Sequence, residues 1–269
     1  MPAPEHPLLA VAIAAAKAGG EVLMTYFRQG VSISCKNGES ADLVSEADIK
    51  AENAIIRVLH ATFPEHAILG EESATETDPN SPALWVIDPL DGTTNFLHDV
   101  PHFAVSIGYF EFGQPVCGVV WNPAREDLYT ALKGQGATHN GQPIHVSSTD
   151  RLDQSLVGTG FHVIRDAKLG ATLGAIEELF GLNIHCIRRF GSAALDLCHV
   201  ASGLYGAYFE YQLSAWDFAA GMLIAQEAGG QVTTGRGTPL QLQRSSILAS
   251  NGVLHPQMVD IVGRHHERF

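Results

Sequence analysis

The sequence predicts a fold of mixed α+β and α/β class, organised in two halves that meet near residue 147. Three observations support this prediction. Two helical patterns open the chain, and several short β-type runs separated by turn sequences follow them. Beyond about residue 147, β-type runs alternate with helical patterns, which is typical of an α/β arrangement. We therefore expect an α+β half at residues 1–147 and an α/β half at residues 148–269.

The first half begins with two predicted helices. Residues 7–27 are rich in alanine, with a helical pattern that ends near Gly30. Residues 42–63 form the second pattern, which repeats at three- and four-residue spacings through Ile49, Glu52, Ile55, Ile56 and Leu59. Short strands are then predicted at residues 68–69, 84–87, 103–109, 116–121 and 128–131. Turn sequences at residues 112–115 and 140–143 separate or close these strands.

The second half is predicted to alternate strands with helices. Strands are expected at residues 156–161, 184–188 and 205–209, and near residues 231–232. Helices are expected at residues 167–180, from Ser192 onward, and at residues 216–228. The chain has no internal repeat, low-complexity tract or obvious linker that would mark a sharper boundary between the halves.

The composition is that of a globular protein with a substantial core. The 269 residues are 45% hydrophobic and 17% charged, which is ordinary for a folded chain. We expect no apolar stretch of the roughly 18 to 20 residues that span a bilayer, and no signal peptide. The four scattered cysteines form no Cys-x-x-Cys pair and are expected to be reduced, mostly buried thiols, namely Cys35, Cys117, Cys186 and Cys198. These features predict a cytoplasmic protein that does not associate with membranes.

The formal net charge of −13 restricts the partners of this chain. It disfavours direct nucleic-acid binding, which depends on Lys and Arg side chains that neutralise phosphates. An anionic substrate would also be repelled by clustered carboxylates unless divalent cations lay between them.

The segment at residues 85–96 carries the strongest chemical signal. A buried strand at residues 84–87 would deliver Asp88 at its carboxyl end, where Pro89 is expected to end the ladder. Gly92 permits a tight turn, and Thr93 can open a helix whose free N–H groups attract an anion. Two carboxylates on one turn, Asp88 and Asp91, suit Mg²⁺ and a phosphoryl group.

A plain turn is the alternative for the same segment, because Asp-Gly is a common turn pair and Asp91 would suit a helix cap. Spacing excludes two other motifs. An EF-hand needs oxygen ligands at alternate positions and a closing Glu. A phosphate-accepting Asp-x-Asp-Gly-Thr arrangement needs carboxylates two residues apart, whereas Asp88 and Asp91 are three apart.

Further acidic residues occur near this segment or at the start of predicted helices. Glu71 follows a short apolar run shortly before the Asp88 strand, where adjacent acids are often only a solvated loop. Asp217 begins a helix, a position that the helix dipole favours in any case. Asp48 fits a capping box with Ser45, and Lys36 has the character of a solvated cation.

The thirteen histidines predict no zinc site. His98 and His102 are four residues apart but belong to no His-Glu-x-x-His motif, and oxygen ligands suit magnesium better. His265 and His266 are expected to form a solvated tail near the C-terminus.

Together these segments resemble the inositol monophosphatase family of lithium-sensitive, magnesium-dependent phosphatases. The matching segments appear in family order at Gly70-Glu71-Glu72-Ser73, Trp85–Phe96, Phe190–Leu197 and Trp216–Gly230. The similarity extends over nearly the whole chain, and the Gly-Ser-Ala-Ala-Leu-Asp-Leu stretch is especially similar to the bacterial members. The resemblance implies the layered αβαβα sandwich of the sugar-phosphatase type.

The resemblance also implies a metal-ligand set. Glu71, Asp88 and the backbone carbonyl of Leu90 would hold one Mg²⁺ ion, while Asp88, Asp91 and Asp217 would hold a second. Family members often bind a third, weaker ion near Glu71. Mn²⁺ would substitute for Mg²⁺, whereas Li⁺ and Ca²⁺ would inhibit.

The resemblance implies further roles for residues at matching positions. Asp48, Thr93 and Glu71 are the implied catalytic residues, with Asp48 and Thr93 deprotonating a water. The implied substrate-binding residues are Gly92, Thr93, Gly191, Ser192, Ala193, Glu210 and Asp217. Lys36 matches a loop lysine near the site, but its spacing to Asp42 is one residue longer than the family pattern.

The expected function is hydrolysis of inositol monophosphate or a similar polyol phosphate by attack of metal-activated water, without a covalent phosphoenzyme. Asp-Gly-Thr-Thr-Asn-Phe and Glu210 favour polyol substrates, since bisphosphate nucleotidases more usually have Asp-Gly-Thr-Lys. The alternatives are a related phosphatase acting on histidinol-phosphate, fructose-1,6-bisphosphate or a nucleotide phosphate, and a partner of transcription antitermination complexes. The resemblance further implies a homodimer.

Overall fold

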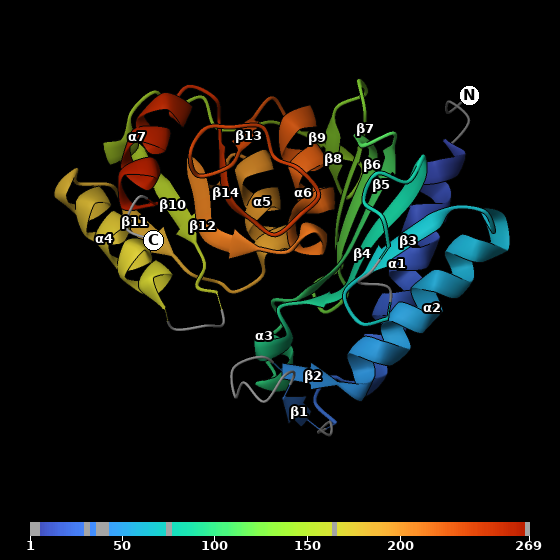
Figure 1. The fold of residues 1–269 in the computed structure, drawn as a ribbon. Helices are drawn as coiled ribbons and strands as arrows, with labels where there is room; N and C mark the ends of the chain where they lie inside the picture. The colour runs from blue at the N-terminus through green and yellow to red at the C-terminus, as the bar shows by residue number, and fades with distance from the viewer. Residues whose placement is uncertain (1–5, 30–32, 36–42, 74–76, 163–165, 267–269) are drawn as a thin grey trace.

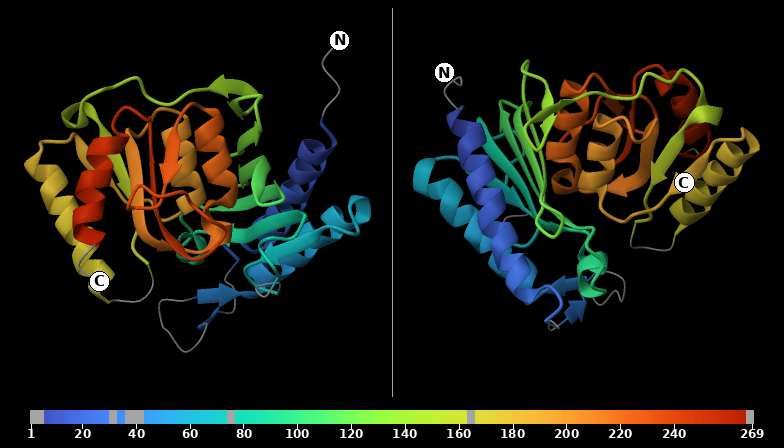
Figure 2. Two further views of the ribbon diagram at one scale, coloured as in Figure 1. Left: turned by 45° about the horizontal axis from the view of Figure 1, so that its top comes forward. Right: turned by 180° about the vertical axis from the view of Figure 1, so that it is seen from behind.

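The computed structural model describes residues 6–29, 33–35, 43–73, 77–162 and 166–266, and these form five layers (Figure 1). Helices α1 (Pro7–Tyr26) and α2 (Glu46–Thr62) form the first layer. A seven-stranded sheet, helices α5 (Ala193–Ala201) and α6 (Ala215–Glu227), and a five-stranded sheet follow. Helices α4 (Ala167–Gly181) and α7 (His255–His266) complete the stack. The order αβαβα confirms the predicted fold, and Figure 2 shows the same layers from two further directions.

The seven-stranded sheet has the order β3-β4-β5-β6-β7-β8-β9. Only β3 and β4 pair in parallel, and every later neighbour is antiparallel, as in a meander. Its strands are β3 (Ala67–Gly70), β4 (Ala83–Asp91), β5 (Ala104–Glu111), β6 (Gln114–Asn122), β7 (Asp127–Leu132), β8 (Ala137–His139) and β9 (Gln142–Ile144). The turn sequence at residues 140–143 joins β8 to β9, with Asn140 and Gly141 both at positive φ.

Both faces of this sheet are covered, which explains why β4 is apolar along most of its length. Trp85 and Ile87 belong to the core shared with α1 and α2. Leu84 and Val86 belong to the core shared with α5 and α6. Because successive side chains of a strand point to opposite faces, the alternation divides β4 between two cores.

The five-stranded sheet has the order β11-β10-β12-β14-β13. Its strands are β10 (Leu156–Thr159), β11 (Cys186–Arg188), β12 (Ala207–Leu213), β13 (Gln231–Thr233) and β14 (Ser245–Ser250). β10 is parallel to β11 and β12, but β14 is antiparallel to both β12 and β13. The sequence predicted the parallel strands but not β14. Because β14 is antiparallel to its neighbours, the second half contains a mixed sheet and not a uniform α/β alternation.

The expectation of a solvated tail at His265 and His266 is wrong, because both residues end α7. The Nε2 atom of His265 lies 2.9 Å from a carboxylate oxygen of Glu178 on α4. The Nε2 atom of His266 lies 2.9 Å from the Ser246 hydroxyl on β14. These contacts fix the last turn of α7 against its neighbours.

Helix α1 corrects a second expectation. It is 20 residues long and contains an 18-residue window with a mean hydropathy of 1.6, so by length and composition it would be able to cross a membrane. A third of the window is buried within the fold, where small residues such as Ala12, Ala15 and Ala16 pack against α2 and the sheet. Alanine-rich packing, which needs many small apolar residues in a row, accounts for the hydropathy of this helix.

The two halves of the chain pack against each other, although each half forms its own sheet. The change of sheet falls between β9 and β10, on either side of residue 147. Helix α6, from the second half, packs on β4, β5 and β6 of the first. The division into units 1–147 and 148–269 therefore stays a prediction. Among the predicted thiols, Cys117 and Cys198 are buried and free and Cys186 is partly buried, while the side chain of Cys35 lies outside the described part.

Candidate active site

A bulge in β4 brings the two predicted aspartates to the same face of the sheet. Asp88 pairs with Ser106 and Asp91 pairs with Ala104, so three steps on β4 match two steps on β5. In a regular strand, residues three apart point to opposite faces, but one extra residue restores the same side. The strand thus continues past Pro89 to Asp91, and the expectation that Pro89 ends the ladder is wrong.

Glu71 and Asp217 come to this end of β4 from two other elements. Glu71 directly follows β3, and the parallel register that pairs Gly70 with Ile87 places it beside Asp88. Asp217 lies in the first turn of α6, whose residue Trp216 accepts a hydrogen bond from Ser106 of β5 at 3.4 Å. Segments more than 100 residues apart in sequence therefore supply four neighbouring carboxylates.

Burial and neighbouring carboxylates raise the pKa of Asp88 and Asp217. Burial raises the pKa of Asp88 well above its usual range, and repulsion from Glu71, Asp91 and Asp217 raises it further. Burial and the charges of Glu71 and Asp91 likewise raise the pKa of Asp217. The pKa of Asp91 rises to about 6, chiefly because of burial. Asp88 is buried, whereas Glu71, Asp91 and Asp217 keep part of their surface exposed, so the cluster is reachable from solvent.

Hydrogen bonds from the main chain hold three of these carboxylates. The Leu90 N–H donates to Asp88 Oδ1 at 2.9 Å. The Ser214 N–H donates to Asp217 Oδ2 at 2.7 Å, so Asp217 also has the helix-capping role that its position suggested. Asp91 Oδ2 accepts from the Ser192 hydroxyl at 2.5 Å and from the Ala194 N–H at 2.7 Å, both at the start of α5.

The donor set suits a divalent cation. Several carboxylate oxygens near one another are the ligands that Mg²⁺ prefers, and the groups whose charges raise the pKa of Asp88 and Asp217 are themselves carboxylates. As the side chains stand, no three acidic, histidine or cysteine residues in the described part close around an ion.

The predicted phosphate side lies directly after β4. Gly92 has φ of +96° and is followed at once by α3 (Thr93–Leu97). A Cβ at Gly92 would lie 3.1 Å from the His102 carbonyl oxygen, so this turn requires glycine. The Thr93 hydroxyl lies 3.1 Å from the Leu90 carbonyl and 3.4 Å from Asp48 Oδ1, on the buried face of α2. Asp48 and Thr93 are therefore neighbours, as predicted from their implied shared role.

Asn95 joins this turn to the second half of the chain. Its side-chain amide donates to the carbonyls of His102 and Phe190, each at 2.7 Å, and approaches that of Gly191 at 3.4 Å. Gly191 has φ of +86° and precedes Ser192, the N-cap of α5. Ser192 thus contacts the carboxylate of Asp91, and its implied role in substrate binding stays a prediction.

Glu210 enters the site from β12. Its carboxylate is buried and accepts a hydrogen bond of 2.7 Å from the Tyr208 hydroxyl. Burial raises its pKa to about 7, against the lowering effects of Tyr208 and Arg189. A Cβ at Gly160, just after β10, would lie 1.9 Å from Glu210 Oε2, so glycine there makes room for this carboxylate. Burial raises the pKa of the nearby Asp196 as well, and the charges of Asp91 and Glu210 raise it further.

The structure thus brings together most residues that the sequence singled out. Asp48, Glu71, Asp88, Leu90, Asp91, Gly92, Thr93, Gly191, Ser192, Ala193 and Asp217 lie at or beside this end of β4, and Glu210 of β12 interacts electrostatically with Asp91 and Asp217. Lys36 and the side chain of Ser45 lie outside the described residues. Sequence reasoning missed Asn95, Asp196 and the buried Glu52. Only Glu52 carried a signal, as a charged residue within an apolar helical repeat.

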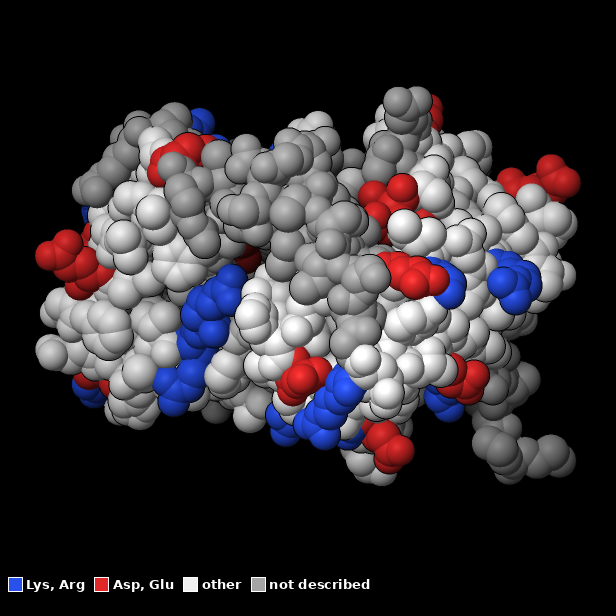
Figure 3. All heavy atoms as spheres, turned by 90° about the horizontal axis from the view of Figure 1, so that it is seen from below, with Lys and Arg blue, Asp and Glu red and all other residues white. Residues whose placement is uncertain are grey.

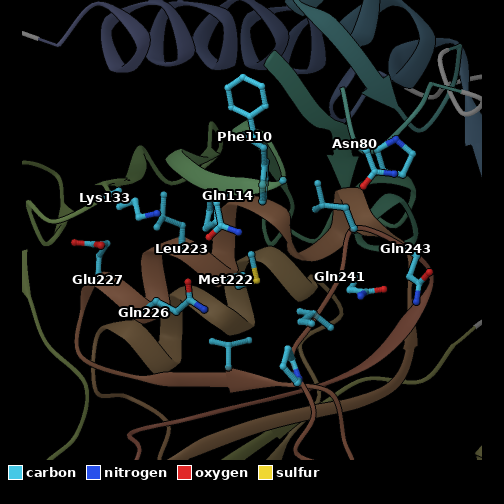
Figure 4. A pocket seen from close by; sticks show the side chains of 18 residues that line it. Asn80, Phe110, Gln114, Lys133, Met222, Leu223, Gln226, Glu227, Gln241 and Gln243 are labelled. Carbon is cyan, nitrogen blue, oxygen red and sulfur yellow. The ribbon is translucent and has the colours of Figure 1, made fainter. Parts of the chain in front are cut away.

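A pocket of about 670 Å³ lies away from this cluster, near the last turns of α6 (Figure 4). Met222 and Gln226 of α6, Gln114 of β6 and Lys133 are among its lining residues, and none of the predicted site residues lines it. Both carboxylate oxygens of Glu227 accept main-chain N–H groups, from Gly134 and Gly136. The rest of the lining is amide and apolar, so it has none of the character of the carboxylate cluster.

Known proteins resemble this chain over nearly its full length. The Inositol monophosphatase family matches residues 5–267. The Inositol-1-monophosphatase of Synechocystis is 42% identical over 93% of this chain and 86% of its own. The Nus factor SuhB of Pseudomonas aeruginosa is 42% identical over 91% of this chain and 92% of its own.

Solved structures agree with these sequence matches. The crystal structure of extragenic suppressor protein suhB from Bartonella henselae matches with a TM-score of 0.89 at 36% identity, covering 96% of this chain and 98% of that one. The order of layers, the carboxylate cluster at the end of β4 and these similarities agree. This chain belongs to the inositol monophosphatase family.

Proposed function

We propose that this phosphatase-family chain is a Mg²⁺-dependent phosphomonoesterase that hydrolyses inositol monophosphate, or a similar polyol phosphate, to the free polyol and phosphate. The carboxylate cluster carries the proposal. Glu71, Asp88, Asp91 and Asp217 come from three separate parts of the chain, and their charges raise the pKa of Asp88 and of Asp217. A fold gains nothing from such repulsion by itself, so the cluster is best explained as a binding site for positive charge.

The proposed metal ligands are Glu71, Asp88, Asp91, Asp217 and the carbonyl of Leu90. Two to three Mg²⁺ ions held there would supply positive charge that accepts the phosphate and lowers the pKa of a water. Mn²⁺ is expected to substitute, and Li⁺ and Ca²⁺ to inhibit. The chain's own contribution is to hold the carboxylates in place through the N–H groups of Leu90, Ala194 and Ser214.

Thr93 and Asp48 are the proposed proton acceptors. The Thr93 hydroxyl, 3.4 Å from Asp48 Oδ1, would accept the water proton as it passes its own to Asp48. Glu71 would assist at the same water. The first N–H groups of α3, at Gly92 and Thr93, would donate to phosphate oxygens, because the opening turn of a helix has no intrahelical partner for them. Stabilisation of the spreading phosphoryl charge would then supply most of the rate enhancement.

The polyol side is assigned to β12 and the start of α5. Glu210, with a pKa raised to about 7, can accept from or donate to a substrate hydroxyl. Gly191, Ser192 and Ala193 lie across the site from β4, where they face Asp91. A dense set of hydrogen-bonding groups favours a hydroxyl-rich leaving group over an apolar one.

Phosphate release from a substrate panel tests the proposal. The panel contains inositol-1-phosphate, 2′-AMP, glycerol-2-phosphate, histidinol-phosphate and fructose-1,6-bisphosphate, each with Mg²⁺ and with or without millimolar Li⁺. We expect inositol-1-phosphate to be cleaved fastest and Li⁺ to suppress release. Faster cleavage of histidinol-phosphate or the bisphosphate would support the related phosphatases, and no cleavage with any divalent ion would rule out the enzyme.

A role in transcription complexes is the second candidate, favoured by a relative named Nus factor SuhB. On the face seen in Figure 3, basic side chains lie in small groups with acidic ones between them, which does not suit direct nucleic-acid binding. A partner protein would therefore have to mediate the role. Retention of purified RNA polymerase or a Nus-type factor by the immobilised chain would support it.

We further propose that the protein is cytoplasmic and forms a homodimer.

A further inference from the structure

Glu52 is a buried carboxylate outside the proposed ligand set. It lies on α2, one helical turn after Asp48, with 1% of its surface exposed. A buried carboxylate is costly unless hydrogen bonds compensate it, and an apolar side chain would pack at this helix position at a lower cost. The hydrogen bonds of its two oxygens therefore indicate its role.

Both oxygens hold the turn that carries Glu71. The Oε2 atom accepts the N–H of Glu72 at 2.9 Å. The Oε1 atom accepts the hydroxyl of Ser73 through a short hydrogen bond. On the other side of Glu71, a Cβ at Gly70 would lie 2.7 Å from Oε2, so the main chain passes close to the carboxylate there too. Glu52 thus contacts the residues on both sides of Glu71.

We propose that Glu52 is a positioning residue, which fixes the turn at residues 70–73 so that the Glu71 carboxylate faces Asp88 and Asp217. The inference rests on the proposed metal-dependent function. β3 ends at Gly70, so residues 71–73 lie beyond the strand. The α2 helix, held by the core beneath it, supports this turn through Glu52.

Glu52 would hold Glu71 in position, as the start of α5 holds Asp91. Glu52 accepts the N–H of Glu72, next to the proposed ligand Glu71, and Ser192 donates to the carboxylate of the proposed ligand Asp91. Loss of such support costs roughly 10- to 100-fold in metal affinity in known metal sites. A role confined to stability would lower the melting temperature without changing metal affinity.

Three variants separate these roles. Glu52→Gln keeps the size but places an amide NH₂ against the Glu72 N–H or the Ser73 hydroxyl. Ser73→Ala removes one of the two hydrogen bonds from an exposed position. Glu46→Gln, on the same helix with an exposed side chain, is the matched control. Mn²⁺ binding is followed by electron paramagnetic resonance of the free ion, and thermal unfolding is measured in chelator.

We expect Glu52→Gln to weaken at least one Mn²⁺ site roughly 10-fold or more, Ser73→Ala to weaken it less, and Glu46→Gln to bind as wild type. Saturating Mg²⁺ should then restore most of the turnover. Wild-type Mn²⁺ affinity in Glu52→Gln, whatever its melting temperature, would overturn the inference. If Glu52→Gln does not fold, unchanged affinity in Ser73→Ala would overturn it. Absence of Mn²⁺ binding by the wild type would instead contradict the proposed function.

Discussion

Neutralising Glu210 should reduce the loss of stability that the metal-free protein suffers as pH rises. Burial raises the pKa of this carboxyl from 4.5 to about 7. Between these values the unfolded chain has lost the proton while the folded chain retains it. Stability therefore falls as pH rises from 4.5 to 7, and the whole penalty is present above 7. Glu210→Gln has no such proton to lose.

The expected size follows from the pKa shift. One pKa unit corresponds to about 1.4 kcal/mol, so a shift of about 2.5 units gives about 3 kcal/mol. Glu210 also raises the pKa of Asp196 and Asp217, so its removal relieves their penalties in the same direction. Between pH 4.5 and 8, wild type should lose on the order of 3 kcal/mol more stability than Glu210→Gln.

Urea unfolding monitored by circular dichroism measures this difference. Both proteins are unfolded at pH 4.5 and pH 8 in chelator, and the free energies of unfolding are extrapolated to water. Glu177→Gln, at an exposed position on α4, serves as the control and should follow wild type. If wild type and Glu210→Gln lose equal stability over this range, Glu210 is not a buried, proton-retaining group and the reasoning fails.

Three further variants test other parts of the site. Asp91→Asn should lower turnover and Mg²⁺ affinity together, and normal activity at ordinary Mg²⁺ would remove Asp91 from the ligand set. Gly160→Ala places a methyl 1.9 Å from Glu210 Oε2, so KM for inositol-1-phosphate should rise several-fold while Mn²⁺ affinity stays unchanged; a loss of Mn²⁺ affinity would contradict this. Ser192→Ala removes the α5 cap and the 2.5 Å bond to Asp91, so it should cost about 1 kcal/mol in urea unfolding and weaken Mn²⁺ binding. Unchanged Mn²⁺ binding would show that Ser192 does not hold Asp91 in place.

The layered fold and most of the site were predictable because they depend on local patterns. The apolar run before Asp88 indicates a buried strand whether or not its partners are known. The order of the acidic motifs identified their family, and with it the five layers. The hydroxyl and glycine pattern at Gly92 and Thr93 likewise indicates a turn into a helix.

The remaining features depend on contacts between distant segments. The bulge in β4 depends on the pairing of Asp91 with Ala104 on β5, which the β4 sequence does not specify. Strand β14 is stabilised by pairing on both sides, with β12 and β13, and its serine-rich sequence gave no periodic signal. The hydrogen bond from Ser192 to Asp91 appears only once α5 is placed against Asp91, 101 residues earlier.

Phosphate release from inositol-1-phosphate across a Mg²⁺ titration tests the central claim most directly. If the carboxylate cluster binds the catalytic ions, the protein should be active only with divalent cations. Release should be absent in chelator, rise to saturation with Mg²⁺, and require more Mg²⁺ in Asp91→Asn. Release in chelator equal to that at saturating Mg²⁺ would contradict the account.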